Sequence, residues 1–138
     1  MKKGGNISVK NLTIKYGDKV AINDVSIELI EGKVTAFIGP SGCGKSTFLR
    51  AFNRMNDEII GASMEGDISW MGKQILSDEI DPVLLRRAVS MVFQKPNVFP
   101  ISIYENVAFG LRIQGENEPS NLDAAVKQSL VDAALWDE

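Results

Sequence analysis

One stretch decides the fold of this chain: Gly39-Pro40-Ser41-Gly42-Cys43-Gly44-Lys45-Ser46. It fills every fixed position of the phosphate-binding loop, in which a glycine and four free positions precede Gly-Lys-Ser/Thr. The glycines let the backbone curl so that successive N–H groups point at phosphate oxygens. Lys45 is expected to reach the β- and γ-phosphates, and the Ser46 hydroxyl to ligate Mg²⁺. The motif therefore predicts a site for a nucleoside triphosphate.

The segments on either side of the loop supply the context that the motif requires. Val34–Ile38 is a short apolar run rich in strand formers, which predicts a strand buried on both faces. After Lys45 the apolar residues recur at helical spacing, which predicts a helix carrying Phe48, Leu49, Phe52 and Met55. A glycine-rich turn that matches by chance is the alternative, and the strand-loop-helix order disfavours it.

Composition excludes several classes of protein. The chain has 138 residues, enough for one domain with a proper core. Its 15 basic and 18 acidic residues leave a net charge of −3, which argues against a nucleic-acid-binding surface. A single cysteine excludes an internal disulfide and fits a reducing cytosol. No apolar run approaches membrane-spanning length, no signal peptide begins the chain, and histidine is absent.

Two alternating stretches precede the loop. The first runs from Ile7 to Tyr16 and changes phase at Lys10-Asn11, which predicts a strand with a bulge. The turn Gly17-Asp18-Lys19 leads to a second stretch, from Val20 to Leu29, with its own phase change at Asn23-Asp24. Amphipathic strands joined by a tight turn predict an antiparallel layer over the nucleotide-binding core.

The segments after the loop predict a mixed pattern of elements. We expect, in chain order, an irregular segment (57–66), a hairpin around Gly72-Lys73, a short helix (82–87), a second buried strand (88–93), a loop (94–100), a helix (102–112) begun by a Ser102/Glu105 capping box, a polar linker (114–120) and a last helix (122–133). No stop signal ends that last helix. We therefore interpret the chain as the N-terminal portion of a longer protein, or a truncated product.

Three features beyond the loop carry a family resemblance. Tyr16-Gly17 ends the first strand, Gln94 follows a predicted buried strand, and a long segment of unusual composition, from Val92 to Val107, surrounds Gln94. Together with Leu49–Asp57 and Ala134–Glu138, they make nearly the whole chain resemble the ATP-binding subunit of ABC transporters. The resemblance is greatest to the subunit that powers bacterial phosphate import.

The resemblance implies a fold and its division. An α/β fold is expected, with a P-loop NTPase (RecA-like) core, an antiparallel β layer and the start of an α-helical subdomain. The expected boundaries are 6–33 for the β layer, 34–94 for the P-loop core and 95–138 for the start of the helical subdomain, all within the N-terminal part of an ABC nucleotide-binding domain.

The resemblance also implies roles for individual residues. Tyr16 would stack its ring on adenine, and removal of its hydroxyl would then matter little. Gln94 would be catalytic, sensing the γ-phosphate and the attacking water, and would bind Mg²⁺ together with Ser46. The implied nucleotide-binding residues are Tyr16, Gly39, Pro40, Ser41, Gly42, Cys43, Gly44, Lys45, Ser46 and Thr47. Tyr16 as a plain strand aromatic, and Gln94 as an ordinary loop amide, are the alternatives.

Partners and location follow from the same resemblance. The loop after Gln94 would press on transmembrane permease subunits, and a second copy of the subunit would complete each ATP site. The subunit would lie peripherally on the cytoplasmic face of the inner membrane. An importer for another solute, a phosphate-loop kinase or a GTPase, and a non-enzymatic nucleotide-binding fragment remain alternatives. No Asn-Lys-x-Asp motif of a GTPase occurs, and Arg86-Arg87 is the only close arginine pair a kinase lid could use.

Departures from the family bear on activity. The family requires an acidic pair after a second buried strand, a serine-glycine-glycine signature and a switch histidine, and the sequence has none of them in place. Asp137-Glu138 follows a helical pattern, so we reject it as the catalytic pair. We expect an ATPase in the parent protein, and ATP binding without turnover in this chain. Cys43 is a further hypothesis, because loop N–H groups and Lys45 favour a nucleophilic thiol there; a small filler is the alternative.

Overall fold

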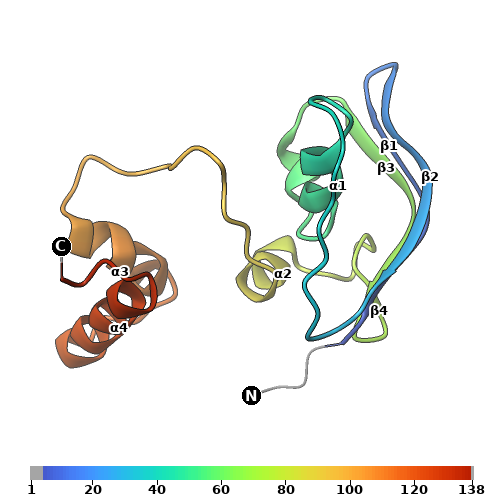
Figure 1. The fold of residues 1–138 in the computed structure, drawn as a ribbon. Helices are drawn as coiled ribbons and strands as arrows, with labels where there is room; N and C mark the ends of the chain where they lie inside the picture. Colours follow the sequence, from blue (N-terminus) through green and yellow to red (C-terminus); the bar gives the residue numbers. More distant parts are fainter. Residues whose placement is uncertain (1–4, 138) are drawn as a thin grey trace. The chain divides into compact units, whose positions relative to one another are not determined.

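The computed structural model describes residues 5–137 as two compact units, the first ending at Val92 and the second beginning at Phe93 (Figure 1). The first unit contains an antiparallel sheet, the phosphate loop and three short helical segments. The second unit is a pair of helices. Each unit is described by itself below.

An antiparallel sheet forms the frame of the first unit. Within the described residues its strands are β1 (Ile7–Tyr16), β2 (Lys19–Leu29), β3 (Ala62–Trp70) and β4 (Lys73–Gln74), in the order β2-β1-β3-β4. The predicted β layer and the hairpin around Gly72 are confirmed. The expectation that 57–66 is irregular is wrong from Ala62 onward. Strand β2 pairs with one edge of β1, and β3 pairs antiparallel with the other edge, from Tyr16↔Ala62 to Ile7↔Trp70.

The predicted bulge in β1 is confirmed, and Gly66 makes room for it. The β1 register shifts between Val9 and Leu12 on the β2 side and between Lys10 and Thr13 on the β3 side. Asn11 has a φ of 49° and donates its backbone N–H to Ser26 Oγ at 2.8 Å. A Cβ at Gly66 (φ 106°) would lie 2.5 Å from the carbonyl oxygen of Asn11. The two backbones therefore approach too closely for any side chain there.

The core of the first unit lies between the sheet and its helices. Helix α1 (Lys45–Ala51) lies against one face of the curved sheet (Figure 1), and Phe48 packs edge-on against Phe52 at a centroid distance of 5.0 Å. The 3₁₀ segment η1 (Met55–Glu58) and helix α2 (Pro82–Ala88) follow along the chain. The buried apolar residues of this core are Val9, Leu12, Ile14, Phe48, Ala51, Phe52, Ile68, Ile75 and Leu85.

The two predicted buried strands are not strands. In the segment before the loop Val34 is 100% exposed and Ile38 is 94% exposed, and only Phe37 packs against the core. In the later segment Ala88 ends helix α2, and Val92 is 96% exposed. Neither segment pairs with another strand within residues 5–137. A parallel strand needs backbone partners alongside it, so an apolar run alone does not make one.

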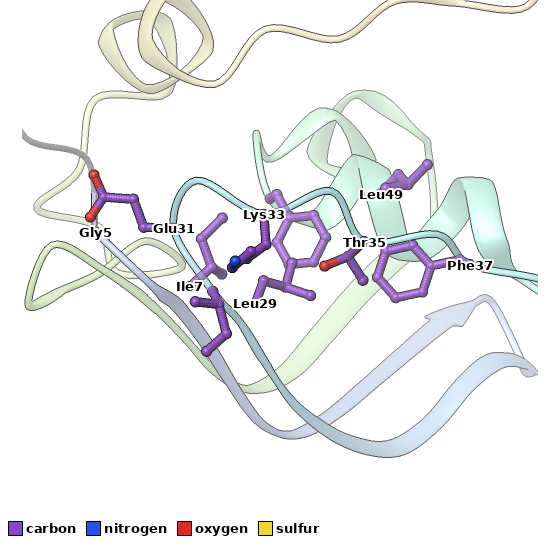
Figure 2. Close-up of a pocket in the computed structure, with 10 residues that line it drawn as sticks. Gly5, Ile7, Leu29, Glu31, Lys33, Thr35, Phe37 and Leu49 are labelled. Carbon is purple, nitrogen blue, oxygen red and sulfur yellow. The ribbon is translucent and has the colours of Figure 1, made fainter.

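A pocket marks where the segment before the loop passes the sheet. It has a volume of about 300 Å³ and lies beside the ends of β1 and β2 (Figure 2). Ile7, Leu29 and Phe37 line its apolar part, and Lys33 and Glu31 lie at its polar part. Lys33, Thr35 and Phe37, from the segment that forms no strand, contribute to its lining.

The second unit is a helical hairpin with a small core. Helix α3 (Ile103–Ile113) begins with the predicted cap, since Ser102 Oγ accepts a hydrogen bond from the Glu105 N–H at 3.1 Å. Helix α4 (Pro119–Asp132) begins before the predicted end of the polar linker. Ala108, Leu122 and Val126 form the buried core between them. Over residues 5–137 no helix is long and apolar enough to cross a membrane.

Substituting Gly66 should measure the tight contact between β1 and β3. Gly66→Ala forces a Cβ onto the Asn11 carbonyl and strains a left-handed φ, so we expect a loss of about 1–3 kcal/mol in the free energy of unfolding. Gly72→Ala is the matched control, because Gly72 has a φ of 75° but no atom near its Cβ position. Urea unfolding should show the larger loss for Gly66→Ala. Equal losses would mean that backbone strain alone, and not the contact with the Asn11 carbonyl, explains the destabilisation by Gly66→Ala.

Candidate functional site

The phosphate loop is held directly against strand β2. Gly44 precedes α1 with a φ of 96°, and a Cβ there would lie 2.7 Å from both the Ala21 carbonyl oxygen and Ile22 Cδ1. Gly44 is therefore required both by its backbone conformation and by the closeness of β2. Its carbonyl accepts the first helical hydrogen bond from the Phe48 N–H at 2.8 Å. The contact sets where α1 begins, and so where the polar residues of its first turn lie.

Lys45 places its ammonium group inside the curve of the loop. Its Nζ donates to the carbonyl oxygens of Gly39 at 2.8 Å and Pro40 at 2.7 Å, and lies 3.5 Å from Cys43 Sγ. These hydrogen bonds hold the loop curved around the Lys45 ammonium group. An ammonium group has three donors and a flexible stem, so the same donors can turn to phosphate oxygens at little conformational cost.

Ser46 and Cys43 are both exposed. Ser46 follows Lys45 in α1, and the Cys43 thiol is free. In the part of the chain that the structure describes, no group of three histidine, cysteine, aspartate or glutamate side chains could hold a metal ion.

Tyr16 and Thr47, both predicted as nucleotide-binding residues, are brought together by a residue that was not predicted. The Tyr16 hydroxyl donates to Asn56 Oδ1 at 2.9 Å and lies 3.2 Å from the Thr47 Oγ1. The expectation that the Tyr16 hydroxyl matters little therefore needs revision, because that hydroxyl ties the end of β1 to α1. No sequence signal distinguished Asn56 from its neighbours, since its importance comes from which residues it touches.

Two arginines hold η1, which carries Asn56, against the α2 region. Arg54 donates to the Ser77 and Ile80 carbonyls at 3.0 and 3.2 Å and pairs with Asp57 at 2.8 Å. Arg86 of α2 donates to the carbonyls of Asn53 at 3.2 Å and Arg54 at 2.9 Å, and pairs with Glu58 at 2.9 Å. The carbonyls of Asn53, Arg54, Ser77 and Ile80 thus each accept a hydrogen bond from a charged donor, which fixes the segment after α1.

Gln94 stands apart from this description. It is exposed and belongs to the second unit, next to the segment that leads into α3. Its predicted catalytic and metal-binding roles remain predictions. The loop that follows it is organised by Asn106, whose Nδ2 donates to the carbonyls of Phe99 at 3.1 Å and Ile101 at 3.1 Å. Asn106 Oδ1 in turn accepts from the Phe99 N–H at 2.8 Å, so the side chain closes the turn before α3.

Comparison with known proteins finds a matching family and a set of similar proteins. Residues 22–137 match the family model described as ABC transporter. The chain is 54% identical over 132 residues to the phosphate import ATP-binding protein PstB 1 of Vibrio parahaemolyticus, covering 96% of this chain and 48% of that protein. It is 49% identical over 138 residues to the PstB protein of Prochlorococcus marinus, covering 100% of this chain and 51% of that protein. The chain thus spans about half the length of the curated relatives it matches.

Solved structures share the fold. A bacterial Atm1-family ABC exporter with ATP bound has a TM-score of 0.76 at 27% identity, covering 99% of this chain and 22% of that chain. The protein cbiO1 from Clostridium perfringens, described as part of the ABC transporter complex cbiONQ, has a TM-score of 0.71 at 29% identity, covering 90% of this chain and 48% of that chain. The predicted fold class, a P-loop NTPase with an antiparallel layer, is confirmed.

Removing the Lys45 ammonium should weaken nucleotide binding. Lys45→Ala leaves backbone donors alone for the phosphates, and charge-assisted bonds of this kind are worth about 1.5–3 kcal/mol. Calorimetric titration should therefore show the affinity for Mg-ATP falling about tenfold to a hundredfold. Lys73→Ala, an exposed lysine in β4, is the charge-matched control and should leave the affinity unchanged. Equal ATP binding by Lys45→Ala and the wild type would contradict the assignment of the loop.

Cys43 provides a chemical probe of the same loop. It is the chain's single cysteine, exposed, and 3.5 Å from the Lys45 Nζ, so a thiol reagent should label it alone. The label adds bulk beside the Lys45 ammonium group, within the curve of the loop, and we expect it to abolish ATP binding. Mg-ATP should in turn protect the thiol, as measured by mass spectrometry of the labelled peptide over time. Labelling at one rate with and without Mg-ATP would show that nucleotide does not cover Cys43.

Proposed function

The chain belongs to the ABC transporter family, and we propose that it binds ATP through residues 39–47 within the ATP-binding subunit of an importer for inorganic phosphate. The observation that carries the proposal is the loop itself, which encloses the Lys45 ammonium between the carbonyls of Gly39 and Pro40. The phosphate assignment is supported by relatives about half identical to this chain that are named phosphate import ATP-binding proteins.

In this proposal each part of the triphosphate has its own partner. Lys45 and the backbone N–H groups of residues 40–44 take the β- and γ-phosphates, and Thr47 lies near the α-phosphate. Tyr16 offers its ring to the adenine. Ser46 and Gln94 are the proposed Mg²⁺ ligands, and the ion would neutralise charge on the β- and γ-phosphate oxygens. In the proposed division of the domain at residues 33 and 94, Gln94 is the last residue of the core, whereas the compact first unit ends at Val92.

Hydrolysis is proposed for the whole subunit and not for this chain alone. The transferred phosphoryl group needs a positioned water and charge stabilisation as well as binding. Lys45 supplies charge, and Gln94 would orient the water. The histidine and the signature expected of the family are absent from the sequence, and no acidic pair follows a second buried strand. The proposed activity of this chain is therefore ATP binding without turnover.

The proposed partners are permease subunits in the membrane and a second copy of the subunit. The turn that Asn106 closes carries exposed apolar side chains, among them Val98, Ile101 and Ile103, which suit contact with helices of a permease. A position on the cytoplasmic face of the inner membrane, where ATP is available, belongs to the same proposal.

Turnover by the isolated chain should stay at the background rate. Loss of a general base and of an opposing cap each costs about 10²–10⁴-fold in rate. Phosphate release from the purified chain in Mg-ATP should therefore match that of Lys45→Ala at every protein concentration. Release that depends on Lys45 would contradict this, and would mean that one of the carboxylates we rejected is catalytic.

A hybrid subunit tests the assignment to phosphate import. Residues 6–137 would replace the matching part of the Vibrio parahaemolyticus relative, in cells that lack their own copy of that subunit. We expect uptake of labelled phosphate to return with the hybrid and to be lost again in the hybrid carrying Lys45→Ala. A hybrid that binds ATP normally but restores no uptake would favour an importer for another solute, since its permease contacts would then not fit.

A further inference from the structure

We infer that Asn56 is a positioning residue that sets the distance between the base-binding ring of Tyr16 and the phosphate-binding start of α1. The inference rests on the proposed function, because it concerns how the same site distinguishes a nucleotide from a bare polyphosphate. Asn56 lies outside the phosphate loop, beyond the end of α1, in the segment η1.

Asn56 is a fully buried polar side chain whose amide oxygen and amide nitrogen are both hydrogen-bonded. It is 0% exposed, and its Oδ1 accepts from the Tyr16 hydroxyl at 2.9 Å. Its Nδ2 donates to the Thr47 carbonyl oxygen at 2.9 Å and lies 3.6 Å from Met64 Sδ. Burying an amide costs free energy unless its polar atoms are hydrogen-bonded in this way. We therefore take the positions of Tyr16 and Thr47 to be what this side chain determines.

The bonding partners determine how the amide is oriented. The Thr47 carbonyl can only accept, so the amide nitrogen must face α1, and the amide oxygen must then face Tyr16. The Tyr16 hydroxyl has a single proton, and Asn56 Oδ1 receives it at the shorter of that hydroxyl's two contacts. One side chain therefore joins the last residue of β1 to the third residue of α1.

Two arginines hold the segment that carries Asn56. Arg54, two residues before it, bonds the carbonyls of Ser77 and Ile80, while Arg86 pairs with Glu58, two residues after it. The interactions of Arg54 and Arg86 thus fix the backbone on both sides of Asn56. The hydrogen bond from the Tyr16 hydroxyl to Asn56 then holds the Tyr16 ring in place.

The contact between Asn56 and Tyr16 should affect binding of the base and not binding of the phosphates. Lys45 and the loop bind a triphosphate whether or not a base is attached, whereas Tyr16 can add affinity only when its ring is held at the right place. Loss of the Asn56 contact should therefore lower affinity for ATP and spare inorganic tripolyphosphate.

The test compares two ligands in matched variants of the full chain. Dissociation constants for Mg-ATP and for inorganic tripolyphosphate are measured for the wild type, Asn56→Leu, Tyr16→Phe and the double variant. We expect each single change to weaken ATP about threefold to tenfold, the range for one lost hydrogen bond, with tripolyphosphate unchanged. The double variant should be no weaker than Tyr16→Phe alone, because Asn56 acts through that hydroxyl.

Asn53→Leu is the matched control. Asn53 is also buried and lies three residues earlier, but its Oδ1 accepts from the Met55 N–H and it does not bond Tyr16. Its substitution should disturb stability without changing the ratio of the two constants. An unchanged ratio in Asn56→Leu, or equal weakening of both ligands, would overturn the inference. A wild type that binds neither ligand would overturn the proposed function, and the inference with it.

Discussion

The close approach of Gly44 to strand β2 is the constraint on which the rest of the structure depends. No side chain fits between the loop and the Ala21 carbonyl, so α1 must begin directly against the sheet. That start places Phe48 in the core and Lys45 in the curve of the loop. One short helix thus contributes its apolar face to the core and its first turn to the proposed nucleotide site.

The polar interactions behind the loop extend this arrangement. Asn56 joins β1 to α1, and Arg54 and Arg86 hold the turn that carries it. Every buried side-chain nitrogen or oxygen in the described residues has a partner. Since buried polar groups favour one arrangement over others only when all are satisfied, this network can hold the base side and the phosphate side of the site at a fixed separation.

Local patterns predicted the local features of the fold. Alternation located β1 and β2, the phase change at Lys10-Asn11 located the bulge, and Ser102 located the start of α3. Two apolar runs, 34–38 and 88–93, predicted strands that do not form, because apolar composition reports a tendency to be buried and not the presence of a pairing neighbour. Asn56 could not be found from sequence for a related reason: its contacts with Tyr16 and Thr47 exist only once β1 and α1 are packed.

The central claim is that residues 39–47, held by β2, form the nucleotide site, and hydrogen exchange of the backbone amides tests it most directly. Peptides covering the chain would be compared by mass spectrometry with and without Mg-ATP, in the wild type and in Lys45→Ala. The account predicts that Mg-ATP slows exchange most strongly in residues 39–47, and that Lys45→Ala reduces this protection. Protection located in other segments, or protection at the loop that is the same in Lys45→Ala, would contradict it.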